Sequence, residues 1–490
     1  MNLAASCSLP PAGSSQSSGP PVPGPPSGEV RILLPETLRL SNGLPVWLLP
    51  SHQVPLVTLS LVVRAGSASD PAGKEGLAGL TADMLDEGAA AHGPLEIADL
   101  VDFLGAELST SAQKEFSEVS LEVLSRNLDP ALDIVADVLL RPTFAETEWA
   151  RVKSLALNDL AQRREEPRHV ARVVSERVFY GDSHPYGHPL DGYEGSVKAL
   201  GVDDVKAFYR AHYRPELATL IVAGDVTAED LRDRLERRFG TWRGDGPTPA
   251  PPGATAPRSA APRLVIVDRP DAPQTEIRIL LPAPAFTSPA TAPLTLANTV
   301  LGGTFTSRLV TNLRERNQFT YGASSILLAR GMPAHLTAGS AVHSVKTGAA
   351  LVEFCRELRA METGKFEPGE MEKARSTHWS RTVEALESQE GTLDLYRPLA
   401  ALGLPPEARP EFHRRLATAP AEEVSRRSRE VFRWNAATIV LVGDRSLIEE
   451  QLRELEADPP RDTSGAPCVF PAPTVLGRDG EPIRDAAAIK

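Results

Sequence analysis

The sequence predicts an α+β protein that contains two copies of one unit. Residues 213–242 and 432–458 share an order of features: an aromatic–Arg pair, an apolar run that ends in Gly-Asp, and an amphipathic helix. The Gly-Asp pairs begin at Gly224 and Gly443, 219 residues apart, and this spacing is the period of the repeat. In both halves, strand-like segments precede runs with helical periodicity, an order typical of α+β architecture.

The elements of the first half follow from periodicity and turn residues. An Asn42–Gly43 turn splits the first strand-like segment, and polar and apolar residues alternate over residues 107–124. The expected strands are 38–50, 56–66 and 107–124, and the expected helices are 77–85, 97–104, 127–140 and 146–164. In the second half, strands are expected at 264–270 and 275–284, and helices at 294–301 and 307–316.

A Pro- and Gly-rich stretch separates the two halves. Residues 244–262 contain too many prolines and glycines for a helix or a central strand, so they are interpreted as a linker. Residues 1–30 are rich in Ser, Pro and Gly and are expected to be a disordered tail. The predicted domains are therefore residues 31–243 and 263–460, with a C-terminal tail at 461–490.

Composition excludes several classes of partner and site. A net charge of -12 argues against binding to nucleic acid or anionic membranes. No apolar run approaches the roughly 20 residues of a transmembrane helix. The three cysteines are odd in number and far apart, and they predict neither a disulfide framework nor a cysteine zinc site.

The N-terminal segment leaves the compartment open. It lacks the basic start and apolar core of a signal peptide, so the sequence as it stands predicts a cytoplasmic protein. The string LAASC at residues 3–7 resembles a lipid-attachment motif. If the true start lies upstream, the alternative is a periplasmic lipoprotein tethered through Cys7.

Several motifs in order resemble the pitrilysin/insulinase (M16) family of zinc peptidases, in its short two-domain form. They are SNGLPVWLLP, AGSASDPAGKEGLAGLTADMLDEGA and FYGDSHPYGHPLDG in the first half, and LGGTFTSRLVTNLRERNQFTYGAS in the second. The resemblance spans most of residues 36–458. It implies a clamshell in which each subunit supplies two homologous αβ domains around a chamber.

The resemblance also indicates that the zinc site has been lost. Active members carry His-x-x-Glu-His on a helix, where two His bind zinc and the Glu holds the attacking water. The matching positions here are Gly79, Ala82 and Asp83, and the third ligand matches Asn158 or Asp159. We therefore expect no metal in this chain. His184 and His188 are spaced like ligands, but the prolines around them favour a structural loop.

The second half matches the family at an Arg and a Tyr seven residues apart, Arg314 and Tyr321. The resemblance implies that such a pair binds the peptide backbone and stabilises the developing oxyanion. Taken alone, the same residues would be a surface helix charge and a half-buried aromatic. Gly302 and Gly303 are expected either to form a flexible loop that contacts substrate or to form a tight turn between helices.

Together these features predict a subunit that is not an enzyme on its own. It would pair with a zinc-bearing M16 subunit as a heterodimer, bind peptide, and supply Arg314 and Tyr321 in trans. The zinc cofactor would belong to the partner. The alternatives are a catalytically inert scaffold, like the core subunits of respiratory complexes that share this fold, and a homodimeric peptide-binding protein.

Overall fold

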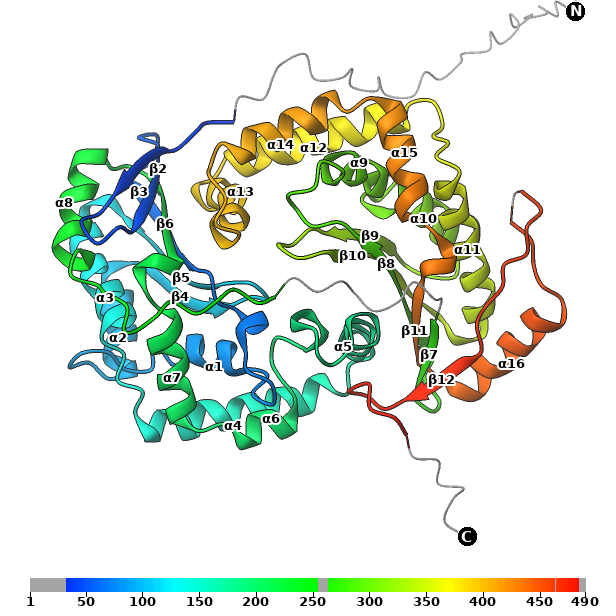
Figure 1. The fold of residues 1–490 in the computed structure, drawn as a ribbon, viewed down its shortest axis with the longest axis horizontal. Coiled ribbons are helices and arrows are strands. Elements are labelled where there is room, and N and C mark those ends of the chain that lie inside the picture. Colours follow the sequence, from blue (N-terminus) through cyan, green and yellow to red (C-terminus); the bar gives the residue numbers. More distant parts are fainter. Residues whose placement is uncertain (1–31, 254–262, 463, 484–490) are drawn as a thin grey trace, which may run out of the picture.

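Two mixed β-sheets of six strands each form the framework of the protein (Figure 1). The computed structural model describes residues 32–253, 263–462 and 464–483. The first sheet has the strand order β1-β2-β6-β3-β5-β4, and the second has the order β12-β7-β11-β8-β10-β9. Helices cover both sheets, and the predicted α+β class is confirmed.

The first sheet belongs to the N-terminal half. Its strands are β1 (Glu36–Arg39), β2 (Pro45–Pro50), β3 (Leu56–Val63), β4 (Glu107–Ala112), β5 (Ser117–Leu124) and β6 (Ala218–Gly224). Strand β6 runs parallel to β2 and antiparallel to β3. The helices of this half are α1 (Leu77–Asp83), α2 (Pro94–Leu104), α3 (Leu128–Leu140), α4 (Glu146–Arg163), α5 (Pro167–Tyr180), α6 (Glu194–Ala199), α7 (Val202–His212) and α8 (Ala228–Phe239).

The second sheet repeats this arrangement. Its strands are β7 (Arg263–Asp268), β8 (Gln274–Ala283), β9 (Ala323–Leu328), β10 (Ala334–His343), β11 (Thr438–Gly443) and β12 (Pro473–Leu476). Strand β11 runs parallel to β7 and antiparallel to β8, as β6 does to β2 and β3. The helices are α9 (Thr291–Gly302), α10 (Arg308–Val310) with a π-helical turn (Thr311–Arg316), α11 (Thr347–Glu362), α12 (Glu370–Leu386), α13 (Gln389–Ala401), α14 (Ala408–Thr418), α15 (Ala421–Val431) and α16 (Arg445–Ala457).

The segments that revealed the repeat occupy equivalent places. Strands β6 and β11 are buried along their whole length, which explains why both are continuous apolar runs. Each ends in Gly-Asp and leads into a capped helix. Thr227 Oγ1 accepts a hydrogen bond from Asp230 N at the start of α8, and Asp444 Oδ1 accepts one from Leu447 N at the start of α16.

Each half contributes one helix that packs on the sheet of the other half. Helix α5 of the N-terminal half packs on β8 and β11, and helix α13 of the C-terminal half packs on β3 and β6. The contacts of α5 are made by small β-branched and alanine side chains, Val170, Ala171 and Val174, against the valines of β7 and β11. Those of α13 include Tyr396, whose ring lies edge-on to Trp47 at 6.4 Å.

The final described segment, residues 464–483, joins the two halves at one edge of the second sheet. It contributes β12, which pairs in parallel with β7. Further on, Asp479 forms an ion pair with Arg164 of the N-terminal half at 3.1 Å. Residues 461–490, which were predicted to form a C-terminal tail, therefore contain a strand of the second sheet. Residues 484–490 lie outside the described residues.

The cysteines predicted no disulfide framework, yet the structure contains one disulfide. Cys355 of α11 and Cys468 form a disulfide, and both side chains are buried. No local pattern indicated this pair, because the two cysteines lie 113 residues apart in the sequence. Cys7, the N-terminal tail and residues 254–262 of the linker lie outside the described residues. Within the described part of the chain, no helix combines the length and the hydropathy that crossing a membrane requires.

Candidate functional site

The positions that match the zinc motif meet at one cavity of the N-terminal half. Gly79 and Asp83 of α1 line a cavity of about 430 Å³ together with Asp159 and Arg163 of α4. Asp191, in the loop before α6, lines the same cavity. Ala82 lies instead in the hydrophobic core and is fully buried. Residues four apart lie on the same face of a helix, so positions 79 and 83 of α1 both face the cavity, as the inverted motif requires.

Close backbone contacts hold α1 against this loop. Gly76 precedes α1 with φ +97°, and Gly192 has φ +73°. A Cβ on Gly192 would lie 2.0 Å from Glu75 O, so only glycine permits this approach. Asp70 accepts hydrogen bonds from Gly76 N and Ala78 N, both at 2.8 Å, at the start of the helix. Burial raises the pKa of Asp70 to about 7, against the two amides, which favour the carboxylate.

One arginine, Arg163, lies among the carboxylates of the cavity and pairs with two of them. Arg163 Nη2 lies 2.7 Å from Asp159 Oδ2, and its Nη1 lies 2.5 Å from Asp191 Oδ2. Asp83 faces the cavity with a pKa raised to about 6, first by desolvation and then by the neighbouring carboxylates of Asp86, Asp191 and Glu87. Arg163 shifts the pKa of Asp83 in the opposite direction.

These residues do not fit a hydrolytic zinc ion. Zinc in such sites takes three protein ligands, usually His, Glu or Asp, and leaves one position for water. Here Gly79 has no side chain, Ala82 has only a methyl group, and Asp159 is already paired with a guanidinium. Among the described residues, no three or more His, Cys, Asp or Glu side chains are grouped so that they could hold a metal ion. The donor set at these positions therefore differs from that of a hydrolytic zinc site.

Arg314 lies in the C-terminal half, on the π-helical turn that continues α10. Its side chain is 35% exposed, and Nε lies 3.4 Å from Glu315 Oε1. The guanidinium also lies over the ring of Phe305, with Cζ 4.3 Å from the ring centroid. The stacking covers one face of the planar guanidinium and leaves its N–H groups, apart from the Nε that faces Glu315, in position to donate hydrogen bonds.

Tyr321 lies on the turn that leads into the edge strand β9, and its side chain is 83% exposed. The turn is fixed on both sides of the tyrosine. Thr320 Oγ1 donates to Ala341 O at 2.6 Å, and Ser340 Oγ donates to Gly322 O at 2.9 Å. The backbone of the turn is thus ordered, while the phenol extends into solvent. The expectation of a half-buried aromatic, drawn from the residues alone, is wrong.

Gly302 and Gly303 end α9 close to β9. A Cβ on Gly302 would lie 2.4 Å from Ser325 N, and one on Gly303 would lie 2.6 Å from Thr299 Cα. Both glycines therefore permit close backbone packing, as in the tight-turn alternative. The participation of the pair in substrate binding stays a prediction.

The structure adds functional candidates and places the histidine pair. Arg163 stands four residues after Asp159, so a helical ion-pair pattern could have identified it. Asp191 and Phe305 had no such local signal.

His184 and His188 flank a single turn of 3₁₀ helix (Pro185–Gly187), and the loop prediction is confirmed. His184 Nδ1 accepts from Tyr186 N at 3.0 Å, and His188 Nε2 donates to Asp182 O at 2.6 Å.

Comparison with known proteins gives matches over both halves. The family model for insulinase (peptidase family M16) matches residues 46–186, and the model for the peptidase M16 inactive domain matches residues 199–377. A relative from Mycobacterium tuberculosis, named an uncharacterized zinc protease, is 28% identical over 303 residues, which are 62% of this chain and 69% of the relative.

Solved structures share the fold. The crystal structure of a peptidase M16 inactive domain from Pseudomonas fluorescens superposes with a TM-score of 0.77 and 23% identity, and covers 84% of this chain and 98% of the other. A chain of complex III2 from Candida albicans superposes with a TM-score of 0.70 and 14% identity, and covers 85% and 96%.

Proposed function

Because the chain belongs to the M16 family of peptidases, we propose that it is the non-catalytic, peptide-binding subunit of a two-chain zinc peptidase. The zinc and the attacking water belong to a partner subunit that carries His-x-x-Glu-His. This chain supplies Arg314 and Tyr321 to the peptide bound at the partner's metal. The two chains together form the chamber in which hydrolysis takes place.

The observation that carries the proposal is the chemistry of the α1–α4 cavity. It presents Gly79 and Asp83 where an active member presents two histidines, and Arg163 ties down Asp159. Arg163 pairs with both Asp159 and Asp191, and Gly79 offers no donor, so the positions that match the zinc ligands lack the three-ligand set of a hydrolytic zinc ion. A peptidase that contains this chain must therefore take its metal chemistry from another polypeptide.

The exposure of Arg314 and Tyr321 supports their assigned role. A guanidinium and a phenolic hydroxyl are both hydrogen-bond donors, and donors aimed at a developing oxyanion stabilise it. Phe305 restricts the arginine from one side, which lowers the entropy lost when it binds a peptide. Among the described strands, the adjacent β9 is an edge strand of its sheet, and an extended peptide can add to such an edge through main-chain hydrogen bonds.

The first experiment compares the isolated chain with the mixed complex. The chain alone should cleave no fluorogenic peptide, with or without added zinc. Addition of its zinc-bearing partner, found by co-purification with the tagged chain, should give cleavage that a chelator abolishes. Chelator-sensitive cleavage by the isolated chain would remove the proposal.

The second experiment tests Arg314 and Tyr321 in the assembled complex. Arg314→Ala and Tyr321→Phe should each lower kcat by about 10²–10³-fold, the usual effect of losing one oxyanion donor. Assembly, measured by size-exclusion chromatography, should be unchanged. Arg453→Ala, which removes an exposed arginine on α16, is the matched control. Full turnover in both Arg314 and Tyr321 variants would leave the pair without the proposed role.

A second candidate is a structural scaffold with no catalytic partner. The similarity in fold to a chain of complex III2 from Candida albicans favours it. A neighbouring reading frame that encodes an intact His-x-x-Glu-His favours the peptidase pair, and co-purification with a stable assembly that lacks such a subunit favours the scaffold.

A further inference from the structure

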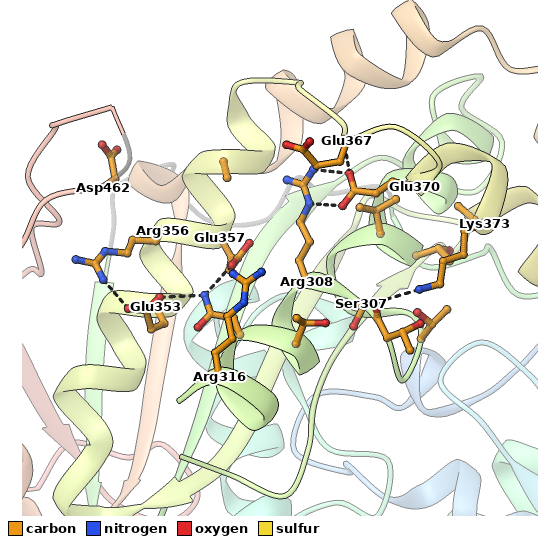
Figure 2. Close-up of a pocket in the computed structure, with 18 of the residues that line it drawn as sticks. Ser307, Arg308, Arg316, Glu353, Arg356, Glu357, Glu367, Glu370, Lys373 and Asp462 are labelled. Atoms are coloured by element: carbon orange, nitrogen blue, oxygen red, sulfur yellow. Dashed lines mark hydrogen bonds and ion pairs between the residues drawn. The ribbon is translucent and has the colours of Figure 1, made fainter. Parts of the chain in front are cut away.

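A second cavity lies in the C-terminal half, beside the helix that carries Arg314. It has a volume of about 740 Å³, within the range of small-ligand sites. Arg308, Thr311, Asn312 and Arg316 line it from one face of this helix, and α11 and α12 form the facing walls (Figure 2). Arg314 does not line this cavity. The cavity is therefore separate from the proposed peptide-binding pair.

Ion pairs and hydrogen bonds fix the walls. Arg308 makes a two-pronged contact with Glu370, with Nε–Oε1 at 2.8 Å and Nη2–Oε2 at 2.6 Å. Asn312 Nδ2 donates to Glu353 Oε2 at 2.9 Å and to Glu357 Oε1 at 2.7 Å, which ties the helix to α11 (Figure 2). Bidentate Arg–carboxylate pairs have a defined geometry, so the cavity is preformed.

Charges of both signs line these walls without a short ion pair. Among the described residues, Arg316, Glu357 and Glu367 form no such pair, although the guanidinium of Arg308 attracts both glutamates at longer range. Glu357 accepts a hydrogen bond from the neutral amide of Asn312. Lys373 adds a further cation, whose Nζ donates to Thr306 O at 3.1 Å.

A buried hydroxyl at the cavity also lacks a partner. Ser307 lines the cavity and is 4% exposed, and its Oγ has no hydrogen-bond partner within the described residues. Buried polar atoms are nearly always paired, because an unpaired one costs about 1–3 kcal/mol. The hydroxyl therefore places an unsatisfied polar group in the wall of the cavity, below its accessible surface.

We propose that this cavity binds a dipolar ligand of the amino-acid type, a free amino acid or a short peptide. Glu357 and Glu367 receive its ammonium group, and Arg316 receives its carboxylate. A simple anion would face the two free glutamates, and a simple cation would face Arg316 and Lys373. Only a ligand with both charges gains from both sets of walls.

Calorimetry on the purified chain tests the ligand class directly. Trialanine, a neutral tripeptide with free ends, should bind saturably. N-acetyl-trialanine and trialanine amide, each lacking one terminal charge, should bind about tenfold more weakly, the effect of losing one charge-assisted hydrogen bond. Equal binding of the three peptides, or no saturable binding of trialanine, would overturn the proposal.

Two substitutions assign each end of the ligand. Arg316→Gln should abolish the preference for trialanine over its amide, and Glu357→Gln, which keeps an acceptor for Asn312, should abolish the preference over the acetylated peptide. The matched controls Arg453→Gln and Glu450→Gln change exposed charges of α16 outside the cavity. Because the blocked peptides test the unaltered chain, the result does not depend on whether a variant folds. Retention of both preferences in both variants would refute the assigned ends.

Discussion

The disulfide between Cys355 and Cys468 makes a prediction about stability that can be worked from the structure. It joins α11 to the segment before β12 and closes a loop over a sequence separation of 113 residues. That loop contains helices α12 to α16 and the central strand β11. Breaking the bond should therefore increase the conformational entropy of a large part of the C-terminal half in the unfolded chain.

The expected magnitude comes from chain entropy. Closing a loop of this length lowers the entropy of the unfolded chain and so raises its free energy by about 4.8 kcal/mol at 25 °C. Measured values are commonly about 2–4 kcal/mol, because unfolded chains retain structure. We expect the free energy of unfolding to fall by about 2–4 kcal/mol when the bond is removed.

The assay is urea unfolding of the oxidised protein and of three variants. Cys355→Ala, Cys468→Ala and the double variant should lose nearly the same stability, because either single change already breaks the bond. Each alanine adds a small cavity at a position no more than 1% exposed, and reduction of the unaltered chain provides the comparison without a cavity.

Thiol counting decides whether the reasoning holds. Of the three cysteines in the sequence, an alkylating reagent in urea should label one before reduction and all three after it. Labelling of three cysteines without reductant, or single-variant losses that add in the double variant, would refute the link between this pair and stability.

Two further predictions follow from buried groups. Burial lowers the pKa of His335 to about 3 and those of His378 and His413 to about 4. The unfolded chain therefore takes up protons below about pH 6.5 that the folded chain does not, and stability present above that pH should fall towards pH 4 by up to about 1.4 kcal/mol per unit for each histidine. Urea midpoints at pH 7.5 and 5.5 measure the slope, His378→Gln should reduce it, and an equal slope in this variant would contradict the assignment. Gly302→Ala should cost about 1–3 kcal/mol, since its Cβ would lie 2.4 Å from Ser325 N, and an unchanged thermal midpoint would show that the contact relaxes freely.

Local signals in the sequence were sufficient for the repeat. The Gly224 and Gly443 segments combine a buried strand, a sharp turn and a capped amphipathic helix, and each of these is set by residues within a few positions of one another. Pairing across the sheets was not accessible in this way. Helices α5 and α13 show an apolar face in the sequence, but periodicity does not identify the sheet that the face covers.

The candidate site likewise combines residues that local patterns identify with residues that only the tertiary structure brings together. Gly79 and Asp83 could be placed on one helical face from spacing alone, and Asp159 was reached through the family resemblance. Asp191 comes from a loop with no pattern, and its contact with Arg163 depends on how the loop before α6 folds back. The Cys355–Cys468 pair needs knowledge of tertiary structure for the same reason.

The exchange of helices between the halves has a consequence for how the two functional regions are held. Helix α4 carries Asp159 and Arg163 of the α1–α4 cavity, and α5, which begins at Pro167, covers β8 and β11. A connection of only three residues thus links the wall of one half to the core of the other. Because α5 buries Val170 and Val174 on the second sheet, separating the halves would expose apolar surface on both. The α1–α4 cavity and the helix that carries Arg314 are therefore held in one orientation relative to each other, and the proposed partner subunit would meet both in that orientation.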